Sequence, residues 1–304
     1  MFIEKVASET IRYIQNCGLS QSTVEWYAMG LRSFARYFKE KNMLNIEEVD
    51  FKFLQEYLEY TRTRPRLDGK SGSLSISTVN TYIKTLRGCF KYLYNVGNIQ
   101  ENPAEKIKYL KKKHSIIASF SAGQVNALVS AIPVNTFTGR RNRLLIRLLL
   151  DCGLRISEAL GIRVKDVYYD EKLLKVTGKG NRERLIPFGE KTKAGFKRWI
   201  EENTLTDNDR VFFSTYRDSI TTSAIRMFLR SYGLKAGLKG VRVSPHIFRH
   251  TFAVMFLRNG GNPFVLQRIL GHSTLEMTQR YVNLLIEDLQ REHEKYGPGD
   301  RFDF

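Results

Sequence analysis

The segment SPHIFRHTFAVMFLRNGGNPFVLQRILGHSTLEMTQRY, from Ser244 to Tyr281, restricts the fold and the chemistry of this chain more than any other stretch. Three of the chain's five histidines lie in it: His246, His250 and His272. It also holds four arginines, and its only acidic residue is Glu276. Such a composition suits the binding of an oxyanion, because guanidinium groups bind phosphate and carboxylate oxygens bidentately.

A metal site is the first alternative for this segment. His246 and His250 are four residues apart, which places both on one face of a helix and could bind zinc. Arg249 shares that region, however, and no nearby cysteine or acidic residue completes a site. Enzymes that work through two metal ions need several carboxylate ligands, which are absent here. We therefore expect no metal and no cofactor, and for His250 a role in filling the core stays open.

The whole chain is strongly basic. Its 304 residues carry a formal net charge of +18, which indicates a polyanionic partner, nucleic acid first and a membrane surface second. The longest apolar run is interrupted by Arg147 and Asp151, and the N-terminus lacks the pattern of a signal peptide. Cys17, Cys89 and Cys152 are odd in number and widely spaced, which is typical of free thiols. We therefore expect a cytoplasmic protein that binds nucleic acid.

Two segments of the first half repeat one pattern. Residues 20–38 and 75–93 share S-x-S-T-V-x-x-Y-x-x-x-L-R-x-x-x-x-Y, which predicts two helices with serine or threonine at their N-termini. The basic residues also correspond, because Arg32 and Arg36 match Arg87 and Lys91. Two interpretations stay open for these residues. They are either solvated charges of amphipathic helices or two ridges that face DNA phosphates.

The domain boundary is predicted in the middle of the chain. Asn102-Pro103 interrupts a helix, and a basic run follows it: Lys111, Lys112 and Lys113. We expect a helical domain over residues 1–97, a linker over 98–115 and a second domain over 116–304. Residues 1–113 carry 19 basic and 12 acidic residues, and the remainder carries 30 and 19. Both halves are therefore basic, at +7 and +11, and we expect both to contact DNA, although the lysine run could be only a solvated tether.

The second half predicts mostly helices with one small β-hairpin. The stretch EKLLKVTGKGNRERLIPF reads as two strands with their turn at Gly178 to Asn181. Ser273, followed three residues later by Glu276, forms the pattern of a capping box, so a short helix presents Tyr281. The predicted fold class is therefore mainly α, with a small sheet in the second domain.

Four motifs, CGLRISEALGIRVKDV, GKGNRERLIPF, HIFRHTFA and ILGHSTLEMTQRY, occur in this order, and the chain resembles the tyrosine recombinase (phage integrase) family. The resemblance implies a DNA clamp built from a helical core-binding domain and a mixed α/β catalytic domain. It implies Tyr281 as the nucleophile, and Glu158 and His250 as supporting residues. The other catalytic residues that it implies are Arg155, Lys179, His246, Arg249 and His272.

The resemblance also implies partners. Family members act on inverted-repeat DNA sites as tetramers that hold two duplexes, and some pass a C-terminal helix to the neighbouring protomer. Here Leu284 to Leu289 could dock in this way or pack on their own domain. The unusual C-terminus favours a mobile-element recombinase over an Xer resolvase. A type IB topoisomerase and a non-catalytic DNA-binding regulator are the alternative functions.

Overall fold

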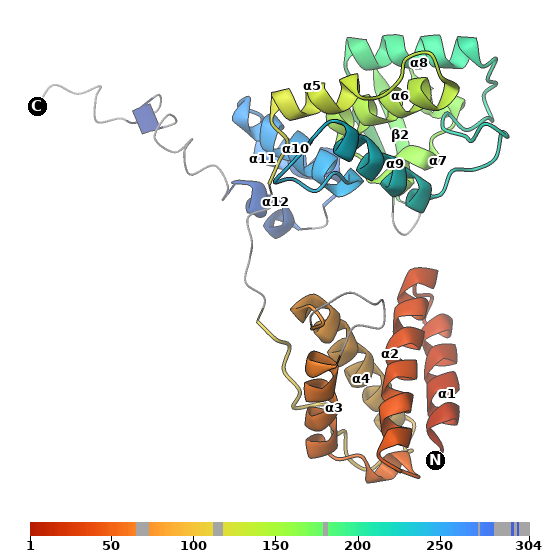
Figure 1. Cartoon of the computed structure of the whole chain (residues 1–304), viewed down its shortest axis with the longest axis vertical. Helices are drawn as coiled ribbons and strands as arrows, with labels where there is room; N and C mark the ends of the chain where they lie inside the picture. The colour runs from red at the N-terminus through yellow and green to blue at the C-terminus, as the bar shows by residue number, and fades with distance from the viewer. Residues whose placement is uncertain are drawn as a thin grey trace, which may run out of the picture. The chain divides into compact units, whose positions relative to one another are not determined.

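The protein divides into two compact units, Met1–His114 and Ser115–Phe304, in this computed structural model (Figure 1). The structure describes residues 1–64, 73–111, 118–178, 182–272, 274–282, 293–294 and 297. Several residues singled out in the sequence lie outside this range: Lys112, Lys113, Lys179, Ser273, and the tail at 283–292 and 298–304. No helix within the described residues is long and apolar enough to cross a membrane.

The first unit is a bundle of helices around an aromatic core. Its elements are α1 (Ile3–Asn16), α2 (Gln21–Glu40), the 3₁₀ turn η1 (Ile46–Glu48), α3 (Phe51–Thr63) and α4 (Ile76–Asn95). Phe34 lies at the centre, with the rings of Tyr57 and Phe90 at 5.1 and 6.0 Å in edge-on geometry. These aromatic side chains are fully buried and therefore supply much of the apolar area that stabilises the unit.

The two repeated segments form α2 and α4, which confirms their prediction as amphipathic helices. The apolar positions of the pattern are buried in both copies: Val24, Tyr27, Leu31, Val79, Tyr82 and Leu86. The helices cross where Gly30 of one lies against Thr85 of the other, and a Cβ at Gly30 would come within 2.7 Å of the Thr85 hydroxyl. Gly88 lies equally close to the Tyr27 hydroxyl. Glycine is therefore required at both positions by the close approach of the helices.

The two repeats differ at their N-termini. The Ser75 hydroxyl accepts a hydrogen bond from the Thr78 amide at 3.2 Å and caps α4 as expected. Ser20 occupies the same position before α2, but its side chain makes no such bond and pairs instead with the Thr23 hydroxyl at 2.9 Å. The cap predicted for the second copy is thus confirmed, and that for the first is replaced by a contact between side chains.

Residues 98–111, which we expected in the linker, pack on the first unit. Ala104 and Ile107 are buried in its core. The Asn80 side chain exchanges two hydrogen bonds with the backbone of Leu110, at 2.9 and 2.8 Å. These contacts hold the segment against α4, because buried apolar groups and paired backbone groups are costly to release.

The second unit is helical with one small sheet. Its helices are α5 (Ala122–Ser130), α6 (Phe137–Cys152), α7 (Ile156–Gly161), α8 (Glu190–Glu202), α9 (Thr222–Lys235), α10 (Pro245–Arg258), α11 (Pro263–Leu270) and α12 (Leu275–Val282), with a 3₁₀ turn η2 (Val164–Asp166). The strands β1 (Val167–Tyr168), β2 (Leu173–Thr177) and β3 (Glu183–Pro187) form an antiparallel sheet in the order β1-β2-β3. The mainly α class and the hairpin are confirmed, whereas β1 and α7 were not predicted.

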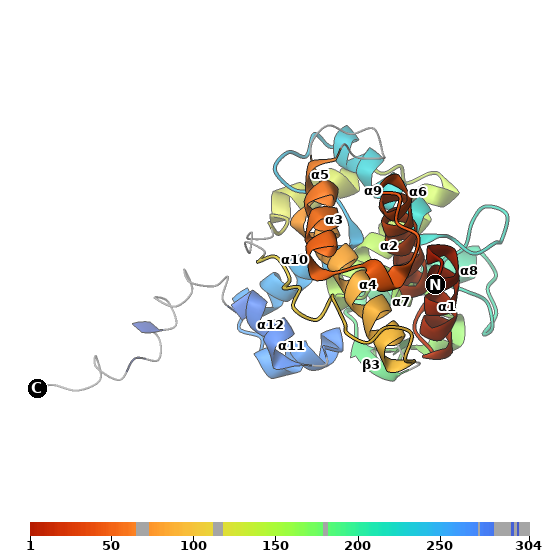
Figure 2. The ribbon, with the colours of Figure 1, turned by 90° about the horizontal axis from the view of Figure 1, so that it is seen from below.

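The packing of α10, α11 and α12 brings together the segments that carry the motifs singled out in the sequence. α10 packs on α6 and contributes Phe248 to the larger core, in contact with Phe120. α11 and α12 follow α10 in the chain and lie side by side next to it (Figure 2). The C-terminal end of α11 therefore meets α10, the start of α7 and the hairpin at one place, where the polar residues of the motifs gather.

Candidate active site

Arg249 is the most buried cation of the site, with only 5% of its surface exposed. Its Nη1 donates to the carbonyl of Gly153 at 2.9 Å, and its Nη2 donates to the carbonyl of Leu270 at 2.7 Å. Both acceptors lie at helix ends, since Gly153 ends α6 and Leu270 is the last residue of α11. The backbone thus fixes the guanidinium through carbonyls that have no partner inside their own helices.

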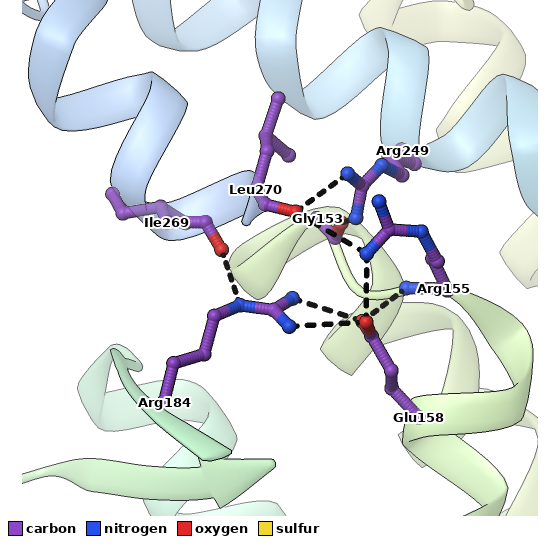
Figure 3. A network of polar contacts seen from close by, with 7 residues as sticks. All are labelled: Gly153, Arg155, Glu158, Arg184, Arg249, Ile269 and Leu270. Carbon is purple, nitrogen blue, oxygen red and sulfur yellow. Dashed lines mark hydrogen bonds and ion pairs between the residues drawn. The ribbon is translucent and has the colours of Figure 1, made fainter. Parts of the chain in front are cut away.

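Arg155 approaches the same carbonyl from the start of α7. Its Nη1 donates to Leu270 at 3.5 Å and to the Glu158 carboxylate at 2.8 Å, while its backbone amide donates to the other Glu158 oxygen at 2.9 Å. The two arginines therefore converge on Leu270, as Figure 3 shows. The Arg155 side chain keeps 39% of its surface exposed, so it can also bind a ligand from solvent.

A third arginine, which we did not predict, completes the cluster. Arg184 of β3 donates to both oxygens of Glu158, at 3.0 and 2.9 Å, and to the carbonyl of Ile269 at 3.1 Å (Figure 3). Its sequence signal is weak but present: Arg184 alternates with the buried Ile186 and so lies on the inner face of the strand.

The charges of the cluster shift the pKa values of its members. Burial and the neighbouring charge of Arg155 lower the pKa of Arg249 to about 10, which leaves it protonated at neutral pH. Burial would raise the pKa of Glu158, but its bonds to Arg184 and Arg155 dominate and lower it, so the carboxylate stays ionised. Two guanidinium groups thus bind the Glu158 carboxylate and a third, that of Arg249, lies within electrostatic reach of it, so the excess positive charge favours an anionic ligand.

Tyr281 lies on α12 and is packed between two histidines. Its ring stacks parallel to that of His272, with centroids 6.2 Å apart, and lies 5.2 Å from the ring of His250. The side chain is 8% exposed and contacts an apolar cluster that includes Leu270. The tyrosine therefore shares an apolar cluster with Leu270, whose carbonyl binds the two arginines, and it lies within electrostatic reach of Arg249.

The histidines differ in environment. Burial and the charges of Arg249, Arg155 and Arg184 lower the pKa of His272 to about 4, so it is neutral at pH 7. Its Nδ1 shares a hydrogen bond of 2.9 Å with the hydroxyl of Thr278, a buried residue one turn before Tyr281 that we did not predict. His246 is exposed on α10, and partial desolvation and Arg249 lower its pKa as well.

The predicted DNA-binding residues of the first unit lie in different settings. Four side chains are exposed: Arg32, Arg36, Lys91 and Lys111. Arg87, in contrast, donates through Nη1 to the carbonyls of Glu105 and Ile107, at 3.2 and 2.6 Å, and its guanidinium lies over the ring of Tyr109. The structure therefore gives Arg87 a role in holding residues 98–111, which the repeat did not indicate.

No group of three or more histidine, cysteine or acidic side chains that could hold a metal ion occurs in the described part of the chain. His250, the second histidine of the predicted zinc alternative, is buried and packs against Tyr281. Within the described residues, the site instead gathers three arginines, the Glu158 carboxylate, Tyr281 and the two histidines that pack on it.

Comparison with known proteins identifies the chain. The model of the phage integrase family matches residues 118–287, and the model of the phage integrase N-terminal SAM-like domain matches residues 10–97. The chain belongs to the phage integrase family. Among its relatives, tyrosine recombinase XerC of Thermodesulfovibrio yellowstonii is 31% identical over 240 residues, which cover 76% of this chain and 78% of the relative. Tyrosine recombinase XerD of Lacticaseibacillus casei is 29% identical over 286 residues, 92% of this chain and 94% of the relative.

Solved structures share the fold of this phage integrase family member. The Tn1549 transposon integrase in complex with transposon right end DNA aligns with a TM-score of 0.75 at 20% identity, over 97% of this chain and 99% of that chain. Together with the family membership, these findings make the protein a tyrosine-type site-specific DNA recombinase. The topoisomerase and the non-catalytic regulator are not favoured.

Proposed function

We propose that this recombinase cuts a DNA strand with the hydroxyl of Tyr281. The phenolic oxygen forms a bond to the scissile phosphorus, the bond from phosphorus to the 5′-oxygen breaks, and a 3′-phosphotyrosyl intermediate and a free 5′-hydroxyl result. One observation supports this assignment: Arg155 and Arg249 converge on the carbonyl of Leu270, a residue of the apolar cluster that buries Tyr281, and Tyr281 lies within electrostatic reach of Arg249. Two fixed guanidinium groups next to a nucleophile would stabilise the charge that grows on the non-bridging oxygens.

The remaining residues of the site are assigned to proton transfer, to phosphate binding and to support. An unperturbed tyrosine has a pKa of about 10, so attack at neutral pH requires a base or nearby cations. We assign the base to His246, because its lowered pKa keeps it neutral and able to accept the phenol proton. Neutral His272 hydrogen-bonds the phosphate. Lys179, carried by the hairpin turn, protonates the departing 5′-oxygen, and Glu158 and His250 support the arginines and the tyrosine.

The reaction continues by transfer of the strand. The phosphotyrosyl bond keeps the energy of the broken phosphodiester, so a 5′-hydroxyl from another duplex can displace Tyr281 without ATP. Two rounds of exchange pass through a Holliday junction and integrate, excise or resolve DNA. The Tn1549 transposon integrase was solved in complex with transposon right end DNA and the XerH recombinase with its palindromic difH substrate, and the net charge of +18 supports double-stranded DNA as the partner here. We place this activity at the nucleoid in the cytoplasm.

The chemistry is tested with a nicked suicide duplex, from which the short product strand diffuses away and leaves the covalent adduct trapped. Wild-type protein should form the adduct, and Tyr281→Phe should bind the duplex with unchanged affinity and form none, because the ring packing survives the change. Persistence of the adduct in Tyr281→Phe would assign the nucleophile to another residue. Strand exchange between two full sites, absent for a topoisomerase, then tests recombination.

The assembly is a separate proposal. Four protomers hold two duplexes that carry inverted repeats, and the C-terminal segment of each protomer docks on its neighbour, which closes a cyclic arrangement. Apolar residues of the tail, among them Leu285, Leu289, Phe302 and Phe304, supply the contacts. Truncation after Asn283 should leave binding to a half-site intact and abolish tetramers and strand exchange in gel-shift and recombination assays. A truncated protein that assembles and recombines normally would show that the tail stays on its own subunit.

A further inference from the structure

Arg184 makes three hydrogen bonds to residues that hold the site together. Its two Nη atoms bind the two oxygens of Glu158 as a fork, and its Nε binds the Ile269 carbonyl (Figure 3). The side chain is 17% exposed, and that of Glu158 is 2% exposed. A bidentate pair at this depth fixes the orientation of both partners, because it restricts rotation as well as distance.

The first consequence concerns Arg155. Glu158 also accepts from the Arg155 guanidinium at 2.8 Å and from its backbone amide at 2.9 Å. The carboxylate thus receives four hydrogen bonds, which is its full capacity. Arg184 therefore holds the carboxylate that in turn holds Arg155, although it lies on a different element of the fold.

The second consequence concerns the end of α11. The Ile269 carbonyl binds Arg184, and the next carbonyl, that of Leu270, binds Arg249. Gly271, which immediately precedes His272, lies directly against the Arg184 guanidinium, and a Cβ at Gly271 would come within 3.0 Å of its Cζ. Gly271 also has a φ of 61°, so the turn into His272 has the conformation and the space that only glycine supplies.

The third consequence concerns the hairpin. A Cβ at Gly178, the residue before Lys179, would lie 3.4 Å from Arg184 Nη1 and 3.5 Å from Glu158 Oε1. The backbone at the base of the turn therefore lies close to this ion pair, with space for no more than a Cβ between them. A single guanidinium thus binds the carboxylate that holds Arg155, and it lies within about one side-chain carbon of both Gly178, before Lys179, and Gly271, before His272.

We propose that Arg184 is a positioning residue that sets Arg155, His272 and the Lys179 hairpin relative to one another without itself binding DNA. This inference rests on the proposed strand-cleavage function. Its guanidinium is directed into the protein, toward Glu158 and α11, and its charge is offset by the carboxylate and by the negative end of the α11 dipole. Loss of the fork would release all three supports together, and displacement of a reacting group by about 1 Å can cost on the order of 10²-fold in rate.

The test compares Arg184→Gln and Arg184→Lys with Arg182→Gln, an exposed arginine of the same hairpin. Covalent adduct formation is measured in single turnover, and the affinity for a half-site is measured as a function of salt. We expect both Arg184 variants to form the adduct on the order of 10²-fold more slowly. We expect the slope of log affinity against log salt concentration to stay unchanged, whereas loss of a phosphate contact would lower this slope by about 0.9.

A pH profile separates positioning from a loss of fold. In Arg184→Gln the buried Glu158 carboxylate loses two hydrogen bonds and a counter-charge, so its pKa should rise. The other charged groups that face it are Arg155 from α7 and Arg249 from α10, and the pKa of Arg249, lowered by burial and by Arg155 to about 10, stays above the range from pH 5 to 8. The rate relative to wild type should therefore fall as the pH falls from 8 to 5, and this fall should vanish in the double variant with Glu158→Gln. If Arg184→Gln does not fold, the same ratio is measured on Arg184→Lys, which keeps the counter-charge but cannot bind both Glu158 oxygens as a fork, so a smaller fall in the same direction is expected.

Three results would overturn the inference. The first is a rate of adduct formation in Arg184→Gln equal to that in Arg182→Gln. The second is a slope of log affinity against log salt lowered by about one in Arg184→Gln, which would indicate a direct contact with DNA, and the third is a wild-type rate in Arg184→Lys, which would show that only the charge of Arg184 matters. Failure of the proposed function is a different outcome, since wild-type protein would then form no adduct at all.

Discussion

The ring of His272 stacks on that of Tyr281 with 8° between their planes, and the Nδ1 of the same histidine is bonded to Thr278, one turn earlier on the tyrosine's own helix. His272 is therefore joined to α12 twice, by its ring contact with Tyr281 and by its hydrogen bond to Thr278. Movement of α12 toward or away from the arginines would carry both side chains together.

The first prediction follows from the bond between Thr278 and His272. Thr278→Val keeps the shape of the side chain and removes the hydroxyl, so His272 loses its orientation but the packing survives. We expect adduct formation to slow by about threefold to tenfold, the effect of losing one hydrogen bond. Thr251→Val is the control, because that buried hydroxyl binds the Phe120 amide at 2.9 Å, away from His272. Equal rates of adduct formation in Thr278→Val and Thr251→Val would show that Thr278 does not orient His272 for the reaction.

The second prediction concerns acid stability in the absence of DNA. The pKa of His272 is about 4 in the folded protein and about 6.5 when unfolded. Between these values the unfolded chain binds the proton more tightly, so stability rises with pH and is lost as the pH falls from about 6.5 toward 4. In His272→Gln the decrease of Tm between pH 7 and pH 5 should be smaller than in wild type. The exposed His246, changed to Gln, should have a weaker effect. Parallel profiles of wild type and His272→Gln would contradict the burial of a neutral imidazole.

The third prediction tests Lys179, which lies outside the described residues. If Lys179 protonates the 5′-oxygen, Lys179→Ala should cleave an ordinary duplex slowly but recover on a duplex with a sulfur at the 5′-bridging position, since a thiolate leaves without a proton. Lys175→Ala is the control, because this lysine lies in β2 and pairs with Asp166 and Glu183. Failure of the sulfur substrate to restore cleavage would remove the general-acid assignment.

The fourth prediction separates two residues that the repeat treats as equivalent. Arg32 is exposed on α2, and Arg87, its counterpart on α4, is bonded to the carbonyls of Glu105 and Ile107. Arg32→Gln should lower the slope of log affinity against log salt by about 0.9 if it contacts a phosphate. Arg87→Gln should instead lower the free energy of unfolding of the first unit by about 1–3 kcal/mol. The checks are half-site binding at several salt concentrations and denaturant unfolding of the whole chain; the reverse pattern would restore Arg87 to the DNA interface.

Much of this protein could be read from local sequence. The helices α2 and α4 follow from one repeated spacing, and the β2–β3 hairpin follows from two apolar stretches around a glycine-rich turn. Arg249 stands between two histidines in a segment almost free of acidic residues, which favoured an oxyanion site, and the resemblance to the tyrosine recombinases implied its catalytic role. These features are encoded within a few turns of chain, where side-chain spacing decides which residues share a face.

The remaining features depend on contacts between residues far apart in the chain. Arg184 reaches Glu158 across 26 positions and Ile269 across 85, and Arg249 reaches the Gly153 carbonyl across 96. Spacing within one helix or strand carries no information about such pairs, so Arg184 resembled any hairpin arginine and Arg87 resembled Arg32. Only the packing of α7, α11 and the hairpin decides which carbonyls and carboxylates are left without water and must be satisfied by an arginine.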